Sequence, residues 1–255
     1  MPHNAPWDWR VSLYTWTKSI SAGAYIVPGM LLLLGHMDVN SPVWTIATPL
    51  FGLTLLAVTG VLLIWDLEHP ERFYMIFTRS QWNSWLVRGG IIIGAYGLVL
   101  FIHALLSWSG EHALLSNIAW AGLPVAVMTS VYTAYLFAQA KARDLWQNPL
   151  LPAHLLVQSV VAGAGVVCLY AKFLDDVSME ILTSIFVGSS AIHLLMILGE
   201  LSLPHASAHG RMAVEEILSG KFRGFFWLSI VLASVGLLAP WGGGIGLVCG
   251  LMGLA

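Results

Sequence analysis

Several side chains that can donate hydrogen bonds or carry protons lie inside long apolar runs of this sequence. Lys18 belongs to the run Tyr14-Thr15-Trp16-Thr17-Lys18, close to the start of the first apolar segment. A charged group is costly in apolar surroundings, so Lys18 is a candidate functional residue. Its ammonium could donate to a carbonyl oxygen, such as that of a quinone. Alternatively, its apolar stem could let the charge reach a nearby polar interface.

Two tyrosines occur one helical turn apart in another apolar segment. Tyr132 and Tyr135 would share a face of a helix at this spacing. A phenol can hydrogen-bond a quinone carbonyl, whereas ordinary packing is the alternative reading of the same spacing.

Three histidines in apolar segments raise the question of haem ligation. His103 and His193 would differ in depth by roughly 15 Å at 1.5 Å per residue, which is too far to clamp one iron. His154 with His193 remains open as a pair. The alternative is that these histidines are hydrogen-bonded or relay protons.

Two carboxylates lie at the ends of apolar segments. Asp66 and Glu200 could each transfer protons or pair with an arginine at an interface. The cysteines, Cys168 and Cys249, have no ligand-type spacing, so we expect neither zinc nor an iron–sulfur cluster in this protein. We expect both cysteines to be small buried apolar residues.

The composition shows what surrounds these side chains. Of 255 residues, 58% are hydrophobic and 9% are charged, and the mean hydropathy is +0.79. Soluble domains carry roughly 25% charged residues. The sequence therefore predicts a single integral membrane domain over 1–255, an all-α polytopic bundle. The first ten residues lack the basic start of a cleaved signal, so we expect the first helix to be retained.

A span needs about 20 apolar residues, which gives about eight transmembrane helices. Their expected ranges are 11–35, 44–66, 85–107, 114–139, 150–172, 181–201, 224–239 and 242–255. The last segment would cover roughly 48 Å as one helix, so the breaker cluster at 240–244 predicts a turn. The eighth span is then a half-span, or the protein continues beyond Ala255.

Basic residues gather on one predicted face. The face that holds the N-terminus and the loops 67–84, 140–149 and 202–223 receives ten of the eleven lysines and arginines. The positive-inside rule makes this face cytoplasmic. The alternative is that these residues dock an acidic partner subunit. We expect Glu68, His69, Arg72, Arg79 and Arg143 to form the docking surface.

Several stretches, in order, resemble the NrfD-like family, the membrane subunits of polysulfide-reductase-type complexes. The densest charged loop is similar to the family signature D-L-x-x-P-x-R-F; it reads Asp66-Leu67-Glu68-His69-Pro70-Glu71-Arg72-Phe73. Trp16-Thr17-Lys18 followed by Ala22-Gly23-Ala24 resembles the first helix of the family. Similar matches open the third helix and follow the fourth, and Glu200 resembles a residue of the sixth.

The resemblance implies an eight-helix protein that has no haem or metal of its own. It implies an exchangeable menaquinone or ubiquinone, bound near the face where a four-cluster ferredoxin-like iron–sulfur subunit docks. Through that subunit it implies a molybdopterin-type catalytic subunit holding molybdenum or tungsten. Membrane lipid is the other expected partner, and no nucleic acid is expected. The location implied is the prokaryotic cytoplasmic (inner) membrane. The polysulfide-reductase type docks its hydrophilic subunits outside, but the basic residues on the docking face of this sequence predict that its partners lie in the cytoplasm.

The resemblance also suggests site residues. Tyr132 matches a tyrosine that lines the quinone pocket of the family. Lys18 falls where a polysulfide-reductase relative has an asparagine, and Ser21 where it has a histidine. With Trp16 from the same motif, these residues form the predicted quinone site. Asp66, Glu200 and His193 are the predicted proton-transfer groups.

Three functions are compatible with these patterns. The first is a quinone-reactive subunit of a multi-subunit oxidoreductase, with no catalytic centre of its own. The second is a haem b anchor cytochrome. The third is a transporter or proton-conducting subunit, which should carry charged groups and broken helices at the midplane. The charges gather instead on one face, which favours the first function.

Overall fold

The computed structural model describes residues 9–67, 69, 71, 73–78, 81–139, 147–174, 179–202, 207–242 and 244–254. All regular structure in these ranges is helical, which confirms the predicted all-α bundle. The long helices are α1 (Trp9–Leu33), α2 (Thr48–Trp65), α4 (Trp85–Ser109), α5 (Leu115–Ala138), α6 (Leu151–Leu174) and α7 (Met179–Ser202). Shorter ones are η1 (Val43–Ala47), α3 (Met75–Thr78), η3 (His112–Leu114), α8 (Ala208–Leu218), α9 (Arg223–Gly236), α10 (Ala239–Gly242) and α11 (Gly244–Met252).

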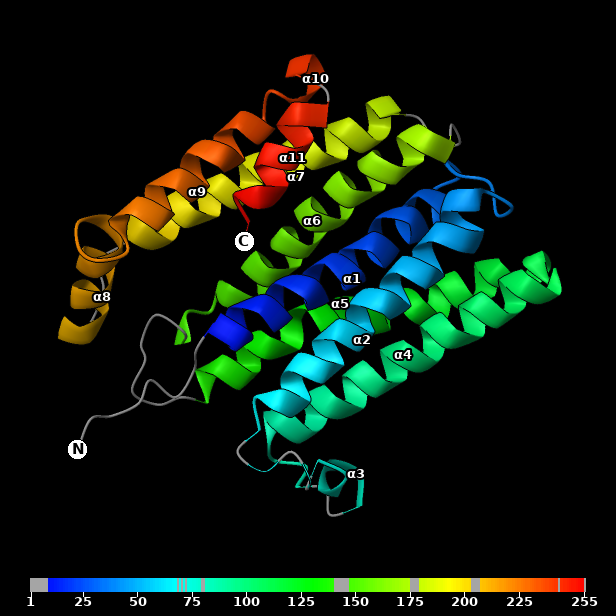
Figure 1. Cartoon of the computed structure of the whole chain (residues 1–255), viewed down its shortest axis with the longest axis horizontal. Helices are drawn as coiled ribbons and strands as arrows, with labels where there is room; N and C mark the ends of the chain where they lie inside the picture. Colours follow the sequence, from blue (N-terminus) through cyan, green and yellow to red (C-terminus); the bar gives the residue numbers. More distant parts are fainter. Residues whose placement is uncertain are drawn as a thin grey trace.

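The helices form two groups that meet along α1 and α6 (Figure 1). In the first group α1 packs against α2 and α5, and α4 completes the set by contacting both α2 and α5. In the second group α6 packs against α7 and α11, and α9 contacts both α7 and α11. Helix α1 therefore has a neighbour on three sides, α2, α5 and α6, which makes it the central helix.

Close packing of α1 on α6 depends on glycine. A Cβ at Gly23 would collide with the carbonyl oxygen of Ser159 and the backbone nitrogen of Gly163. A Cβ at Gly163 would in turn meet the backbone of Gly23. Small residues allow membrane helices to approach in this way. The two helices are thus held at backbone contact distance.

Five helical segments are long and apolar enough to cross a membrane: Val43–Trp65, Trp85–Ser109, His112–Ala138, Leu151–Tyr170 and Met179–Ser202. The pair α8 and α9, bent by 70° at its break, would be a sixth. The predicted count of eight is not confirmed. Helix α1 has 25 residues but is less apolar, because it contains Thr17, Lys18, Ser19 and Ser21. These polar residues are buried against its neighbours.

The C-terminal region has the predicted turn and a short last helix, but its seventh helix is shorter than the predicted span. Helix α9 has 14 residues and α11 has nine, so they extend about 21 Å and 14 Å. A hydrocarbon core is about 30 Å thick, so neither spans it alone. Helix α11 folds back on α9, as the predicted turn requires, and a Cβ at Gly236 would stand 2.8 Å from the Cα of Gly250. The predicted loop 202–223 also contains helix α8, which begins after Ser207, whose side chain accepts from the Gly210 backbone nitrogen.

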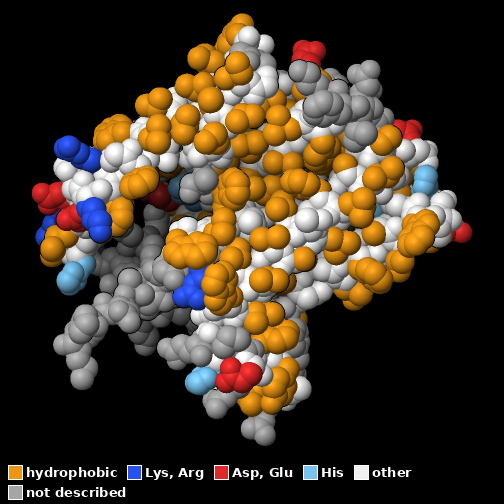
Figure 2. Space-filling model, in the orientation of Figure 1, with side chains coloured by type: hydrophobic (Ala, Val, Ile, Leu, Met, Phe, Trp, Pro, Cys, Tyr) orange, Lys and Arg blue, Asp and Glu red, His pale blue; other side chains and the backbone are white. Residues whose placement is uncertain are grey.

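The surface fits a membrane protein (Figure 2). Hydrophobic side chains cover most of the visible body, whereas lysine and arginine appear at the end that holds α8 and the start of α1. Large apolar residues such as Trp108 and Trp241 are 89% and 83% exposed. Exposed apolar area of this extent is typical of a surface that lipid covers.

Candidate functional site

Lys18 lies fully buried between α1 and α5. Of the lysine and arginine side chains whose burial the structure describes, it is the only one with no exposed area. Its Nζ donates to the backbone oxygen of Ser130 at 3.1 Å and to the Thr133 Oγ1 at 2.6 Å. The Nζ atom also stands 4.6 Å from the centre of the Tyr132 ring. The side chain therefore turns into the bundle, and the alternative that its charge extends to the interface is wrong.

Tyr132 lies beside Lys18 and is 2% exposed. Its ring packs on α4 at Gly89, where a Cβ would overlap the ring. Tyr14 of α1 is near Tyr132 and is also buried. The Tyr132 hydroxyl makes no hydrogen bond to any residue that the structure describes. A buried phenol of this kind has a donor and an acceptor available for a ligand.

The site therefore combines two polar groups from different helices. An ammonium has three N–H donors, and the protein acceptors of Lys18 use two of them. Among the described residues, the third N–H of Lys18 has no oxygen or nitrogen acceptor and has only the Tyr132 ring beside it, and the Tyr132 hydroxyl makes no hydrogen bond. Together they could hold a ligand that has carbonyl oxygens.

The other two predicted quinone residues face elsewhere. The Ser21 Oγ donates to the Gly52 backbone oxygen of α2 at 2.8 Å, and the Tyr96 hydroxyl donates to the Ser21 backbone oxygen at 2.8 Å. Trp16 is seven residues from Gly23 and shares its α6-facing side of α1. Its indole nitrogen is buried and has no partner among the described residues. The structure thus brings together Lys18 and Tyr132, without Ser21 or Trp16.

Asp66 lies at the end of α2, where it pairs with Arg10. The Arg10 Nε stands 3.4 Å from the Asp66 Oδ1, and its Nη1 donates to the Trp65 backbone oxygen at 3.0 Å. Both side chains are between a fifth and a third exposed. This is the interfacial pair that the sequence left open as one alternative for Asp66.

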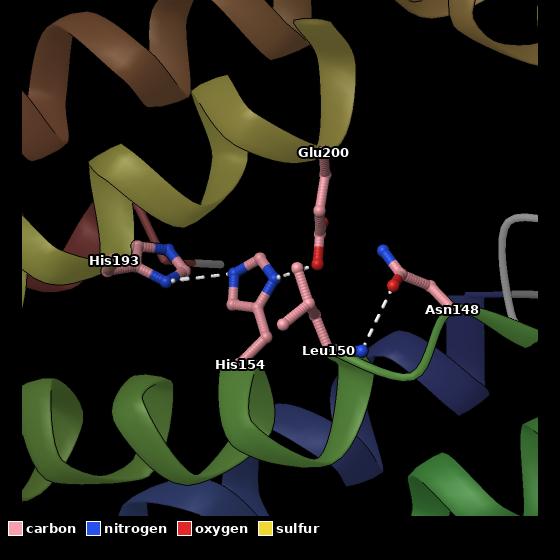
Figure 3. Close-up of polar contacts among 5 residues, drawn as sticks. All are labelled: Asn148, Leu150, His154, His193 and Glu200. Atoms are coloured by element: carbon pink, nitrogen blue, oxygen red, sulfur yellow. Dashed lines mark hydrogen bonds and ion pairs between the residues drawn. The ribbon is translucent and has the colours of Figure 1, made fainter. Parts of the chain in front are cut away.

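Glu200 takes part in a different arrangement, a file of three side chains between α6 and α7 (Figure 3). The His154 Nδ1 stands 3.0 Å from the Glu200 Oε1, and the His154 Nε2 stands 3.0 Å from the His193 Nδ1. A metal binds imidazole nitrogen at about 2 Å, so two opposed ligands lie about 4 Å apart. The histidines are closer than that and are hydrogen-bonded directly to one another. The open alternative of a haem between them does not match this geometry.

His103 lies apart from both sets. Its ring is buried, 4.4 Å from Trp44 and 5.8 Å from Tyr25 between ring centres. No group of three or more metal-binding side chains occurs within the described ranges. His103 therefore belongs to the packed core of the first helix group.

Most of the predicted docking surface cannot be placed. Glu68, Arg72, Arg79 and Arg143 lie outside the described residues. His69 is described, and its Nδ1 stands 3.1 Å from the Glu71 Oε1 with both side chains largely exposed. This exposed pair lies in the charged loop that follows α2.

Some residues that are central in the structure are missing from the predicted site. The sequence predicted Glu200 and His193 as proton-transfer groups. It considered His154 only as a possible haem ligand or a hydrogen-bonded or proton-relay histidine, and did not place it between the other two. His154 lies three residues after the start of α6, and Glu200 lies two residues before the end of α7. Because the neighbouring helices α6 and α7 run in opposite directions, these two positions lie at the same depth in the bundle. The pairing of His154 with Glu200 could therefore have been inferred from their positions in the sequence. No signal marked Ser130 or Thr133 as the partners of Lys18.

Comparison with known proteins agrees with the resemblance. The family described as "Polysulphide reductase, NrfD" matches residues 1–241. Protein NrfD of Escherichia coli is 23% identical, and the match covers 92% of this sequence and 82% of that protein. A selenate reductase subunit of Mesobacillus selenatarsenatis is 24% identical, covering 98% and 70%. One of the polysulfide reductase polypeptides of Wolinella succinogenes is 26% identical, covering 62% and 55%. With nearly the whole sequence matched by the family, the protein belongs to the polysulphide reductase NrfD family.

Proposed function

We propose that this protein is the quinone-reactive membrane subunit of an oxidoreductase complex. In this role it exchanges electrons and protons between the membrane quinone pool and a docked iron–sulfur subunit. The names of the relatives support this proposal, since they are parts of selenate and polysulfide reductases. The protein itself carries no catalytic centre in the proposal, because substrate chemistry belongs to the partner.

The observation that carries the proposal is the pairing of Lys18 with Tyr132. Both are buried, and their remaining donors lack acceptors among the described residues. A buried polar group without a partner costs about 1–3 kcal/mol, and a ligand that supplies the missing hydrogen bond would recover this free energy. A quinone supplies two ring carbonyls and accepts two electrons and two protons on reduction. Lys18 and Tyr132 would hold these oxygens by donating hydrogen bonds.

The position of the pair suits electron entry from one face. Lys18 is nine residues from the first residue of α1, and Tyr132 is six from the last residue of α5. These offsets correspond to depths of about 14 Å and 9 Å from the same end of the bundle. A ring held there lies nearer to that surface than to the opposite one. A short distance to a docked cluster favours electron transfer.

The partners follow from the same proposal. We infer a four-cluster ferredoxin-like subunit at the basic end of the bundle and a molybdopterin-type catalytic subunit attached to it. Basic residues at a membrane-protein face also favour the cytoplasmic side. In this arrangement Arg72, Arg79 and Arg143 contact the iron–sulfur subunit, and the complex lies in a prokaryotic cytoplasmic membrane.

Substitution of the two donors tests this function in the intact complex. Tyr132→Phe and Lys18→Met should each lower turnover with a short-chain menaquinone by about tenfold, since a lost buried hydrogen bond costs about 1–3 kcal/mol. Electron transfer from the complex to a soluble dye should stay unchanged, because that route bypasses this subunit.

Tyr135→Phe is the matched control. Tyr135 is one turn from Tyr132, but it is 39% exposed and stacks on Trp85 with 4.5 Å between ring centres. Quinone turnover should be normal in this variant. Normal quinone turnover in both Tyr132→Phe and Lys18→Met would exclude this pair as the quinone site.

A further inference from the structure

The file of Glu200, His154 and His193 suggests a second activity, separate from the Lys18 and Tyr132 pair. We propose that these three side chains form a proton-transfer path. It admits a proton at the Glu200 end of the bundle, carries it inward between α6 and α7, and ends inside the protein. The path is thus a proton well, open to one side of the membrane only.

The three groups are arranged in order of increasing burial (Figure 3). The Glu200 side chain is 23% exposed, the His154 side chain 13%, and the His193 residue 6%. Both contacts measure 3.0 Å, which is within hydrogen-bond distance. An unbroken series of hydrogen bonds therefore joins a solvent-accessible carboxylate to a buried imidazole.

Histidine suits this role because its two ring nitrogens can bind and release different protons. When a protonated Glu200 gives its proton to the His154 Nδ1, the ring becomes an imidazolium. The proton on the His154 Nε2 then passes to the His193 Nδ1, and His154 is left neutral with its proton on Nδ1. One proton has entered at Glu200 and one has reached His193, so the transfer balances. Return of the proton reverses the same steps.

The two carboxylates at this end of the bundle, Glu200 and Asp66, have different partners. Among the residues that the structure describes, no lysine or arginine pairs with Glu200. Asp66 is the contrast, since it forms an ion pair with Arg10 at the end of α2. A carboxylate that already has a guanidinium partner holds its charge, whereas one bound to histidine can exchange a proton with it. This difference favours Glu200 over Asp66 as the entry group.

Beyond His193, one more polar group is followed by apolar side chains. Ser190, one turn inward from His193 on α7, has a buried hydroxyl without a partner among the described residues. Beyond it on α7 lie Phe186 and Leu182, both with no exposed area. His193 is seven residues from Glu200, or about 10 Å along the helix. A proton on His193 would thus have crossed roughly a third of a 30 Å hydrocarbon core.

A proton that enters part of the membrane moves charge across part of its thickness. We therefore expect a transient current, without a sustained one, when proteoliposomes of the isolated subunit on a capacitive electrode receive a step in pH. The step should act only from the Glu200 side. The orientation of the protein in the vesicles can be determined with a membrane-impermeant label on Ser207→Cys, which lies at the start of α8.

Variants of the file should remove this signal. Glu200→Gln and His154→Phe should reduce the transient to that of empty liposomes, and imidazole should restore it in His154→Gly. Glu215→Gln is the matched control, because Glu215 is exposed on α8, outside the file. Thermal unfolding of each variant separates loss of the signal from loss of the fold.

Each other outcome would contradict the proposal. A wild-type protein without a transient, or a normal transient in Glu200→Gln, would exclude the proton path. A sustained current would show a path through the whole membrane. The measurement needs neither quinone nor a partner subunit, and the transient current should be unchanged in Tyr132→Phe. Failure of the quinone proposal and failure of the proton well are therefore distinguishable.

Discussion

At the scale of single residues, the direction of one side chain decides the proposed quinone site. Lys18 could be picked out from the sequence as a charged group in an apolar segment. Whether it would point inward or toward the interface could not be predicted. That choice depends on Ser130 and Thr133, more than a hundred residues away, which supply the acceptors for its ammonium. No local pattern in α1 contains this information.

The Thr133 hydroxyl should therefore be important for stability. In Thr133→Val the Lys18 ammonium loses its shorter contact, which measures 2.6 Å. A hydrogen bond to a charged group contributes about 1.5–3 kcal/mol, so the free energy of unfolding should fall by a similar amount. Thermal unfolding in detergent measures the change. Thr54→Val is the control, since Thr54 is exposed and bonds only within its own helix. Equal effects of both changes would show that Lys18 does not depend on Thr133.

At the scale of helices, α1 presents a different face to each neighbour. Thr17 and Ser21 bond to α2, Lys18 bonds to α5, and Gly23 touches α6. Runs of glycine and alanine are evident in both α1 and α6, but the sequence did not predict that these two helices would pack against each other. It did not predict the break between α8 and α9, since the residues of α8 read as a polar loop between two spans.

Glycine at the contact between α1 and α6 should tolerate no side chain. Gly23→Ala should prevent stable folding, because its Cβ would overlap the Ser159 carbonyl oxygen and the helices would have to separate. Gly188→Ala is the matched control, since a Cβ there meets nothing within 4 Å. Alanine favours a helix over glycine by about 0.5–1 kcal/mol, so this control should be neutral or slightly stabilising. Size-exclusion profiles and unfolding temperatures in detergent compare the two, and a normally folded Gly23→Ala would contradict the packing described here.

At the scale of the whole molecule, the two candidate sites lie in different helix groups. The Lys18 and Tyr132 pair belongs to the group of α1, α2, α4 and α5, and the Glu200 file belongs to the group that starts with α6. The sequence predicted the membrane class, the first six helices and the basic end, because these depend on composition and local pattern. The breaker cluster at 240–244 predicted the turn before α11, but the backbone contact of Gly236 with Gly250 was not predictable from local pattern.

The central claim is that a quinone ring binds between α1 and α5. Photolabelling of the intact complex with an azido derivative of a short-chain menaquinone tests it most directly, with the labelled peptides identified by mass spectrometry. We predict adducts on residues 14–21 of α1 and 129–135 of α5, which disappear with excess unlabelled quinone and weaken in Tyr132→Phe. Competable adducts confined to α6 and α7, or to any other part of the protein, would contradict this account.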